Sequence, residues 1–357
     1  MKAMEKSLRP WRHALALALV GTLVAATVTM ALGSSVGASS SSNTARAHSY
    51  NFNSPTSAAV VGSHLFVTNG GNNSVTEVKA SNGSFVSAIS GKRLGFDAPS
   101  AIVAVGSDLF VANSADNTIT EFRAAGHKHI RTIQGSSYGF ADPIALAASG
   151  QDLYVLNGAG SITEVATQTG ALVGTASGST FGFNNPTGLA VADGQVFVAN
   201  SGSNTVTVLN ARDRSFVSLL SGSTFAFNTP IGVAFDGTDM WVTNQGADSV
   251  TEFSPTTLNA LNVLVSSNLP MVGPIIYGDG YVFTVSPPGW SPMVSQITPS
   301  PATVNWMMCN TNGPYLFNNP QAAVVAGANL WIVNQGGNSL TEMDTASGAL
   351  IRTVANP

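Results

Sequence analysis

The stretch Pro186–Pro230 reads PTGLAVADGQVFVANSGSNTVTVLNARDRSFVSLLSGSTFAFNTP, and its pattern recurs along the chain at a spacing of about 44 residues. The marker of each repeat is a proline that closes a short segment, aromatic in all but one unit. Successive prolines lie 44, 44, 43, 44, 44 and 46 residues apart. They are Pro55, Pro99, Pro143, Pro186, Pro230, Pro274 and Pro320. This spacing defines seven units of one fold.

Each unit holds four short runs rich in Val, Ile, Phe and Thr, which Gly, Asn, Asp or Ser residues separate. The second run, such as Val196–Asn200, is the most apolar and ends in Asn in six units. Four strands in a repeat of roughly 40–50 residues are typical of a β-propeller blade. The sequence therefore predicts an all-β fold, a seven-bladed β-propeller of four-stranded antiparallel blades. The blades start near residues 55, 99, 143, 186, 230, 274 and 320.

Three recurring residue types predict local roles in this fold. The Phe before each proline is expected to plug the seam between adjacent blades, and the Asn that ends the second strand is expected to fold its side chain onto the following turn. A Thr-Glu pair in the third run predicts a solvated or cation-paired outer edge, with Lys79 and Arg123 as local partners. Val208 and Pro299 replace the Glu in two units. The five carboxylates are Glu77, Glu121, Glu164, Glu252 and Glu342.

The segment Phe197–Asn210, FVANSGSNTVTVLN, resembles the YVTN-type β-propeller repeat and is similar to the related NHL repeat. The resemblance covers Pro55 to Pro357 and implies a propeller fold. Proteins with such repeats include secreted binding or surface-layer modules, extracellular sensor domains and a few lyases and lactonases. The resemblance thus implies a fold without selecting one function.

Residues 1–47 have the parts of a secretory signal peptide followed by a Ser/Ala-rich linker. Four Lys and Arg residues precede the uncharged run Ala14–Leu32, and Ala45–Ala47 forms an A-x-A cleavage pattern. Cleavage after Ala38 is a second possibility. We expect a secreted, extracellular protein whose mature part, residues 48–357, forms the propeller. The alternative is a membrane anchor formed by the uncleaved segment, because 19 apolar residues lie at the lower limit of a membrane span.

The two ends of the mature chain predict a closed ring. Residues 48–55 match the linker that precedes every other blade, and the last blade ends three residues after Val354. Seven blades and seven linkers divided between the two termini require the termini to meet. No complete strand precedes Pro55, so we expect no exchange of a strand between the first and last blades.

Charge and cysteine content restrict the partners. Residues 48–357 carry nine Lys and Arg and 17 Asp and Glu, a net charge of −8, which disfavours nucleic acid and anionic lipid surfaces. No segment after the signal is apolar enough to span a membrane. Cys309 is the only cysteine, so the chain has no internal disulfide and the thiol is expected in the core. We expect a monomer that binds an unknown protein or cell-envelope ligand.

The sixth unit departs most from the repeat and supplies the candidate binding residues. Its second run ends in Ser286 rather than Asn, and a proline-rich turn, Pro287–Pro292, follows. Departures on the loops of a repeat scaffold favour function, and large aromatic side chains are frequent anchors of partners. We predict Trp290, Trp306 and Tyr315 as candidate binding residues.

The sequence predicts no catalytic, cofactor-binding or metal-binding residue and no cofactor. His127 and His129 have a spacing that can bind a metal, but no third ligand is apparent. The first-run residues expected to line the central channel are small or apolar: Ala58, Ile102, Leu146, Leu189 and Val233. We therefore favour a secreted, non-enzymatic binding scaffold at or outside the cell envelope. The alternative is a propeller-type lyase or lactonase with a site at the mouth of the channel.

Overall fold

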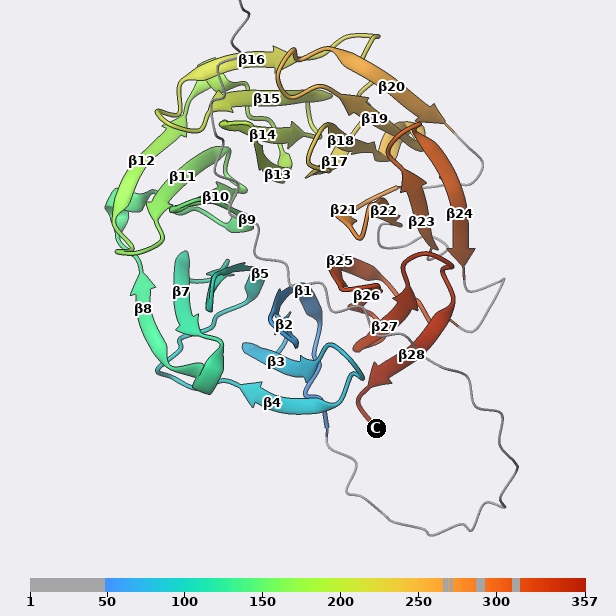
Figure 1. Cartoon of the computed structure of the whole chain (residues 1–357). Coiled ribbons are helices and arrows are strands. Elements are labelled where there is room, and N and C mark those ends of the chain that lie inside the picture. Colours follow the sequence, from blue (N-terminus) through green and yellow to red (C-terminus); the bar gives the residue numbers. More distant parts are fainter. Residues whose placement is uncertain (1–48, 266–268, 270–271, 287–292, 310–314) are drawn as a thin grey trace, which may run out of the picture. The chain divides into compact units, whose positions relative to one another are not determined.

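Seven four-stranded sheets stand around a central axis in the computed structural model of the chain (Figure 1). The structure describes residues 49–265, 269, 272–286, 293–309 and 315–357. In every sheet the strands follow one another in sequence order and pair antiparallel, without a crossover. The predicted seven-bladed propeller of four-stranded antiparallel blades is confirmed.

All seven blades have the same order from the axis outward, with the first strand innermost (Figure 1). Blade 1 holds β1 Pro55–Val61, β2 His64–Asn69, β3 Ser74–Lys79 and β4 Phe85–Ile89. Blade 2 holds β5 Pro99–Val105, β6 Asp108–Asn113, β7 Thr118–Arg123 and β8 His129–Ile133. Blade 3 holds β9 Pro143–Ser149, β10 Asp152–Asn157, β11 Ser161–Ala166 and β12 Leu172–Ser177. Blade 4 holds β13 Pro186–Ala192, β14 Gln195–Asn200, β15 Thr205–Asn210 and β16 Phe216–Leu220.

The last three blades repeat this order. Blade 5 holds β17 Pro230–Phe235, β18 Met240–Asn244, β19 Ser249–Phe253 and β20 Ala260–Val265. Blade 6 holds β21 Ile275–Gly278, β22 Tyr281–Val285, β23 Met293–Thr298 and β24 Thr303–Cys309. Blade 7 holds β25 Pro320–Ala326, β26 Asn329–Asn334, β27 Ser339–Asp344 and β28 Leu350–Ala355. The described helices are single 3-10 turns, η1 Ala125–His127, η2 Ser136–Tyr138, η3 Ser179–Phe181 and η4 Gln245–Ala247, and none of them is long and apolar enough to cross a membrane.

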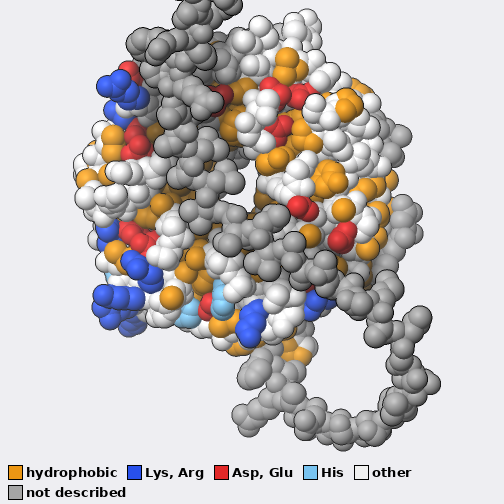
Figure 2. Space-filling view, in the orientation of Figure 1, with side chains coloured by type: hydrophobic (Ala, Val, Ile, Leu, Met, Phe, Trp, Pro, Cys, Tyr) orange, Lys and Arg blue, Asp and Glu red, His pale blue; other side chains and the backbone are white. Residues whose placement is uncertain are grey.

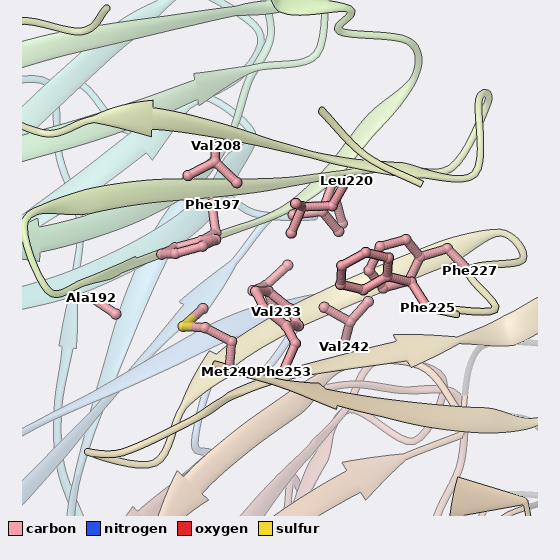
Figure 3. Close-up of a cluster of buried hydrophobic side chains, with 12 residues drawn as sticks. Ala192, Phe197, Val208, Leu220, Phe225, Phe227, Val233, Met240, Val242 and Phe253 are labelled. Carbon is pink, nitrogen blue, oxygen red and sulfur yellow. The ribbon is translucent and has the colours of Figure 1, made fainter. Parts of the chain in front are cut away.

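The hydrophobic core lies in the seams between blades, because each sheet stands edge-on to the axis and packs both faces on its neighbours. Figure 3 shows the seam of blades 4 and 5, where Phe197 faces Met240 and Val242. Phe225 and Phe227, from the linker between these blades, close the cluster at one end. The predicted role of the linker Phe as a plug of the seam is confirmed. Cys309 is buried at the end of β24, as expected.

The first-strand residues expected to line the channel lie in these seams instead. Ile102 and Val233 belong to buried inter-blade clusters, and Ala58, Leu146 and Leu189 pack against such clusters. The expectation is wrong because strand side chains stand perpendicular to their sheet. In a radial sheet they point at the neighbouring blades, whereas the channel faces the edge of the first strand.

The Asn that ends each second strand lies inside its blade rather than on the following turn. The Oδ1 atom of Asn69 accepts a hydrogen bond from the backbone N–H of Asn53 in the preceding linker, at 3.3 Å, and its Nδ2 donates to Oγ1 of Thr76, at 3.0 Å. The corresponding linker bond recurs in blades 2, 3, 4 and 7. The predicted contact with the turn is therefore wrong: this Asn ties the linker to the middle of the sheet.

A second Asn, in the turn after the second strand, joins each of four blades to the linker of the next blade. It has a positive φ, as at Asn117 with 58°, a conformation that Asn tolerates well. Oδ1 of Asn117 accepts the backbone N–H of Asp142 at 2.7 Å. Oδ1 of Asn338, in the last blade, accepts the N–H of Ser54 at 2.7 Å. The same bond thus joins neighbouring blades and closes the ring.

The two ends of the ring meet without exchanging a strand. The side chain of Asn356 accepts the backbone N–H of Phe52, at 3.2 Å, and donates to its carbonyl oxygen, at 2.8 Å. Phe52 also packs with Trp331 and Val354 of the last blade, and β1 lies beside β25. The expected meeting of the termini is present, and all four strands of blade 1 come from residues 55–89.

We predict that Asn338→Ala and Asn117→Ala destabilise the protein equally, each by about 1–3 kcal/mol, because both lose one bond to a backbone N–H and place Ala at a positive φ. The free energy of unfolding in urea measures both losses. If the seam between blades 7 and 1 did not form like the others, only Asn117→Ala would lower the free energy of unfolding. That result would contradict the closed ring.

Candidate functional site

One position of the third strand holds a buried Glu or Gln in every blade except blade 4. Each stands opposite the large second-strand aromatic, as Glu77 does opposite Phe66. The five Glu residues are at most 5% exposed. The expectation of cation-paired carboxylates is confirmed for Glu121, Glu164 and Glu342. The expectation of a solvated outer edge is wrong, because the fourth strand and the next blade cover the third strand. In blade 6 the equivalent residue is Gln296, opposite Phe283, and not Pro299.

In three blades the partner of this carboxylate comes from the fourth strand of the same sheet. Glu121 pairs with Arg131 at 2.8 Å, and Glu342 pairs with Arg352 at 2.6 Å. In blade 5, Nδ2 of Asn262 donates to Glu252 at 2.5 Å. The local cations named from the sequence do not pair with the carboxylates: Arg123 pairs with Asp108 at 2.5 Å.

In two blades the partner comes from the next blade, 50 residues further along the chain. Nη1 of Arg214 donates to Glu164 at 2.5 Å, and Nε2 of His127 contacts Glu77 at 2.8 Å. Each of these partners lies in the turn between the third and fourth strands of its blade and has a positive φ, 62° and 52°. The pairs therefore bridge the seams of blades 3–4 and 1–2.

Which blade supplies the partner depends on the size of two residues. Where the fourth-strand residue opposite the carboxylate is small, as at Gly174, the next turn inserts a long side chain, and a β-carbon at Gly174 would lie 2.5 Å from Nε of Arg214. Where it is large, as at Arg131, the next turn has glycine: a β-carbon at Gly170 would lie 2.7 Å from Cδ of Arg131. The small residue with a long side chain in the next turn recurs as Ser87 with His127. The large residue with a glycine in the next turn recurs as Arg352 with Gly83 and as Trp306 with Gly348. In blade 4, Val208 replaces the Glu and packs in one cluster with Leu258 of the next turn.

Burial sets the electrostatics of these carboxylates. Desolvation raises the pKa of Glu164, Glu252 and Glu342, although Arg214, Asn262 and Arg352 respectively oppose the shift. At Glu121 desolvation raises the pKa to about 6, against the opposing charge of Arg131. Burial of these four carboxylates in the seams thus disfavours their ionised form, and the partners oppose that effect.

The seam of blades 1 and 2 is the one in which imidazoles take the place of arginine. Glu77 contacts Nδ1 of His64 at 2.6 Å through one oxygen and Nε2 of His127 at 2.8 Å through the other. These residues border a hollow of about 390 Å³ together with Val86 and Gly126. His64 is the first residue of β2, and the fold brings it to a buried carboxylate.

His127 and His129 point to different partners. His127 contacts Glu77 across the seam, whereas Nε2 of His129 lies 3.1 Å from Oγ1 of Thr132. Among the described residues, no group of three or more His, Cys, Asp or Glu side chains is arranged to hold a metal ion.

A larger hollow, of about 750 Å³, lies on the other side of the β7–β8 turn, at the seam of blades 2 and 3. Turns of both blades border it, with Gly150 and Gln151 from the β9–β10 turn and Thr167 and Gln168 from the β11–β12 turn. Its charged and titratable residues all come from blade 2: Asp108, Glu121, Arg123, Lys128, His129 and Arg131.

Positive charge is concentrated around these two hollows. Six of the nine Lys and Arg residues after residue 47 lie in residues 55–142, and none lies in residues 230–319. Figure 2 shows Lys and Arg side chains mainly over the side of the ring that holds β4, β8 and β12. This sector differs from the rest of an acidic ring and is our candidate binding region.

Trp306, a candidate from the sequence, lies on β24 in the seam of blades 6 and 7. It is half-buried, and its indole N–H donates to the carbonyl oxygen of Ala346 at 3.2 Å. Its ring packs 6.1 Å from that of Phe283, and Gly348 leaves room for it. These contacts are those of a seam residue.

Tyr315 is the first of two stacked aromatic residues in the linker before blade 7. It is buried, its hydroxyl donates to Sδ of Met308 at 3.0 Å, and its ring stacks on Phe317 at 5.4 Å. Trp290 lies outside the described residues. A ligand contact of Trp290, Trp306 or Tyr315 stays a prediction, while the contacts of the last two are with the core. The basic sector was not predicted from the sequence, although Arg123, Lys128 and Arg131 lie close together in the chain.

We predict that lowering the pH from 7 to 4.5 stabilises the wild type relative to Glu121→Gln by about 1–2 kcal/mol. The pKa of Glu121 is raised from 4.5 to about 6, so its ionised form is disfavoured in the folded state. The stability that this shift contributes is present below pH 4.5 and is lost as the pH rises through 6. Urea unfolding of both proteins at several pH values measures the difference. Two parallel pH profiles would contradict the buried position of this carboxylate.

Comparisons with known proteins agree with the architecture. Residues 183–209 match the family model described as NHL repeat, and no curated protein matches the sequence. Among solved structures, the computationally designed Ika8 protein superposes with a TM-score of 0.61 at 14% identity, over 85% of this chain and 88% of that chain. Likeness at this identity concerns the fold alone. The ring of seven four-stranded blades makes the chain a β-propeller repeat protein, and the matched repeat supports the NHL/YVTN type.

Proposed function

We propose that this protein is an exported, non-enzymatic binding scaffold that acts at or outside the cell envelope. The parts of a signal peptide in residues 1–47 support export. The acidic mature chain disfavours nucleic acid as a partner. A rigid ring with variable turns is a scaffold suited to binding.

The observation that carries the proposal is that the blades themselves engage the buried polar groups. Each described third-strand carboxylate is engaged by its own fourth strand or by the next blade, as Glu164 is by Arg214. These groups hold blades together. A hollow of about 750 Å³ lies instead between the turns of blades 2 and 3, where Arg123 and Lys128 are exposed. A hollow with exposed charges on a rigid ring suits recognition of a ligand.

The alternative is a propeller-type lyase or lactonase with a site at the mouth of the channel. Such an enzyme needs polar groups that converge from several blades, commonly around a metal ion. Metal analysis of purified protein separates the two functions. A stoichiometric divalent ion together with turnover of a lactone or an acidic saccharide would favour the enzyme.

We expect the full-length chain, expressed with a C-terminal tag in a bacterium, to be found in the medium with His48 or Ser39 as its first residue. N-terminal sequencing of the purified protein measures this. Full-length protein in the membrane fraction would support the anchored alternative, and uncleaved protein in the cytoplasm would contradict export.

The exported protein, labelled and returned to intact cells, should bind saturably and be displaced by unlabelled protein. Trp290→Ala is expected to weaken this binding at least tenfold if the prediction for Trp290 holds. Phe216→Ala, which removes an exposed ring on β16, is the matched control and should leave binding unchanged. Binding that never saturates would contradict a scaffold for a cell-envelope ligand.

A further inference from the structure

The hollow between blades 2 and 3 is bordered by a positive charge, that of Lys128, which does not contribute to the packing of the blades. Lys128, at the β7–β8 turn, is exposed, and the described residues include no ion pair of its ammonium group. We propose that this hollow binds a hydroxylated monocarboxylate, such as a uronic-acid sugar, with Lys128 and Arg123 at the carboxylate. This inference rests on the proposed binding function and names the class of ligand.

The charges of the lining favour a single negative charge. Arg123 pairs with Asp108 and Arg131 pairs with Glu121, so the ammonium group of Lys128 is left uncompensated. Burial and then the charge of Arg93 lower the pKa of His129, which is therefore neutral at pH 7. One carboxylate balances this excess charge. A phosphate dianion would bring a further negative charge toward Asp108 and Glu121.

The neutral groups of the lining favour hydroxyls on a compact ring. Gln151 and Gln168 are exposed, and each amide group can donate to and accept from hydroxyl groups. Val105 and Ile130 are half-buried in the same lining and offer an apolar surface to the C–H groups of a ring. A volume of about 750 Å³ lies within the range of small-molecule sites.

Arg123 can donate hydrogen bonds to the ligand while it stays paired with Asp108. Its Nε lies 2.5 Å from Asp108 Oδ1, and its Nη2 donates to Oδ2 at 3.3 Å. A guanidinium group has five N–H donors, so donors remain for a second carboxylate. Lys128 adds a compact charge on a flexible stem close by.

Glu121 makes the predicted affinity of the site for its ligand depend on pH. It lies in the lining, and burial raises its pKa to about 6. A bound carboxylate favours the protonated form of Glu121, so the ligand should bind more tightly as the pH falls from 7 to 5. The carboxylate of the ligand stays ionised in this range.

The test uses three ligands that share a sugar ring: glucose, glucuronate and glucose 6-phosphate. They differ in one substituent, which is neutral, a monoanion or mostly a dianion. NMR titration of the mature exported protein should give an affinity for glucuronate at least tenfold higher than for either of the others. Lys128→Ala should lower that affinity about tenfold. Lys92→Ala, which removes an exposed lysine outside the lining, should leave it unchanged. Glu121→Gln should reduce the gain in affinity between pH 7 and pH 5, and protonation of His129 accounts for what remains.

Several results would overturn the inference. These are equal affinities for glucose and glucuronate, tighter binding of glucose 6-phosphate or of a diglutamate peptide, an unchanged affinity in Lys128→Ala, or no binding of any probe at millimolar concentration. If the protein still binds saturably to cells in those cases, the ligand class is wrong and the proposed function stands. If cell binding is also absent, both are wrong.

Discussion

The constraint on which this ring depends is that a blade buries both faces. Once a sheet stands radially, each third strand is covered by its own fourth strand and by the turn of the next blade. Six of the seven blades nevertheless place a polar side chain there, and five of these are carboxylates at most 5% exposed. A buried carboxylate without a donor costs several kcal/mol, on the order of 3–5 when a partner is removed from a buried pair. Every seam must therefore supply a donor or remove the charge.

The seams supply the donor in different ways, so neighbouring seams differ in the size and charge of their side chains. Glu164 receives Arg214 from the next blade because Gly174 leaves space, whereas Glu121 receives Arg131 from its own blade and the next turn has Gly170. A turn with a long side chain would collide with Arg131 in the second case. We infer that these size and charge matches favour the correct order of blades over pairings between the wrong neighbours, in chains whose seven units are otherwise alike.

The fold could be read from the sequence because its signal is repeated seven times. Spacing of the prolines, four β-rich runs and tight turns are local features, and they sufficed for the blade count and the closed ring. The roles of single residues were harder. The strand-ending Asn is a frequent turn residue, yet Asn69 binds the linker, because backbone N–H groups of the linker are left without a strand partner. Pro299 was taken for the equivalent residue of the sixth unit, although Gln296 follows Pro274 by 22 residues, as Glu77 follows Pro55.

The candidate region was not predicted from the sequence, because its hollow combines side chains of blade 2 with turns of blade 3. Glu77 and His127 are 50 residues apart, as are Glu164 and Arg214, and the same interval joins Val208 to Leu258. This interval of 50 residues was a signal of contact between neighbouring blades. In the three pairs, an apolar residue stands 50 residues from an apolar one, and a carboxylate stands 50 residues from a cation or an imidazole. The cluster of Arg123, Lys128 and Arg131 also carried a signal, because it stands out in residues 48–357, whose net charge is −8.

The account is tested most directly by converting one seam into the other kind. Ser87→Arg with His127→Gly would give the seam of blades 1 and 2 the arrangement seen around Arg131 and Gly170. The free energies of unfolding of the two single variants and the double variant form a double-mutant cycle. The account predicts that each single variant loses about 2 kcal/mol or more and that the double variant recovers at least about 1 kcal/mol of the summed loss. Additive losses would contradict the matching of seams on which the ring depends.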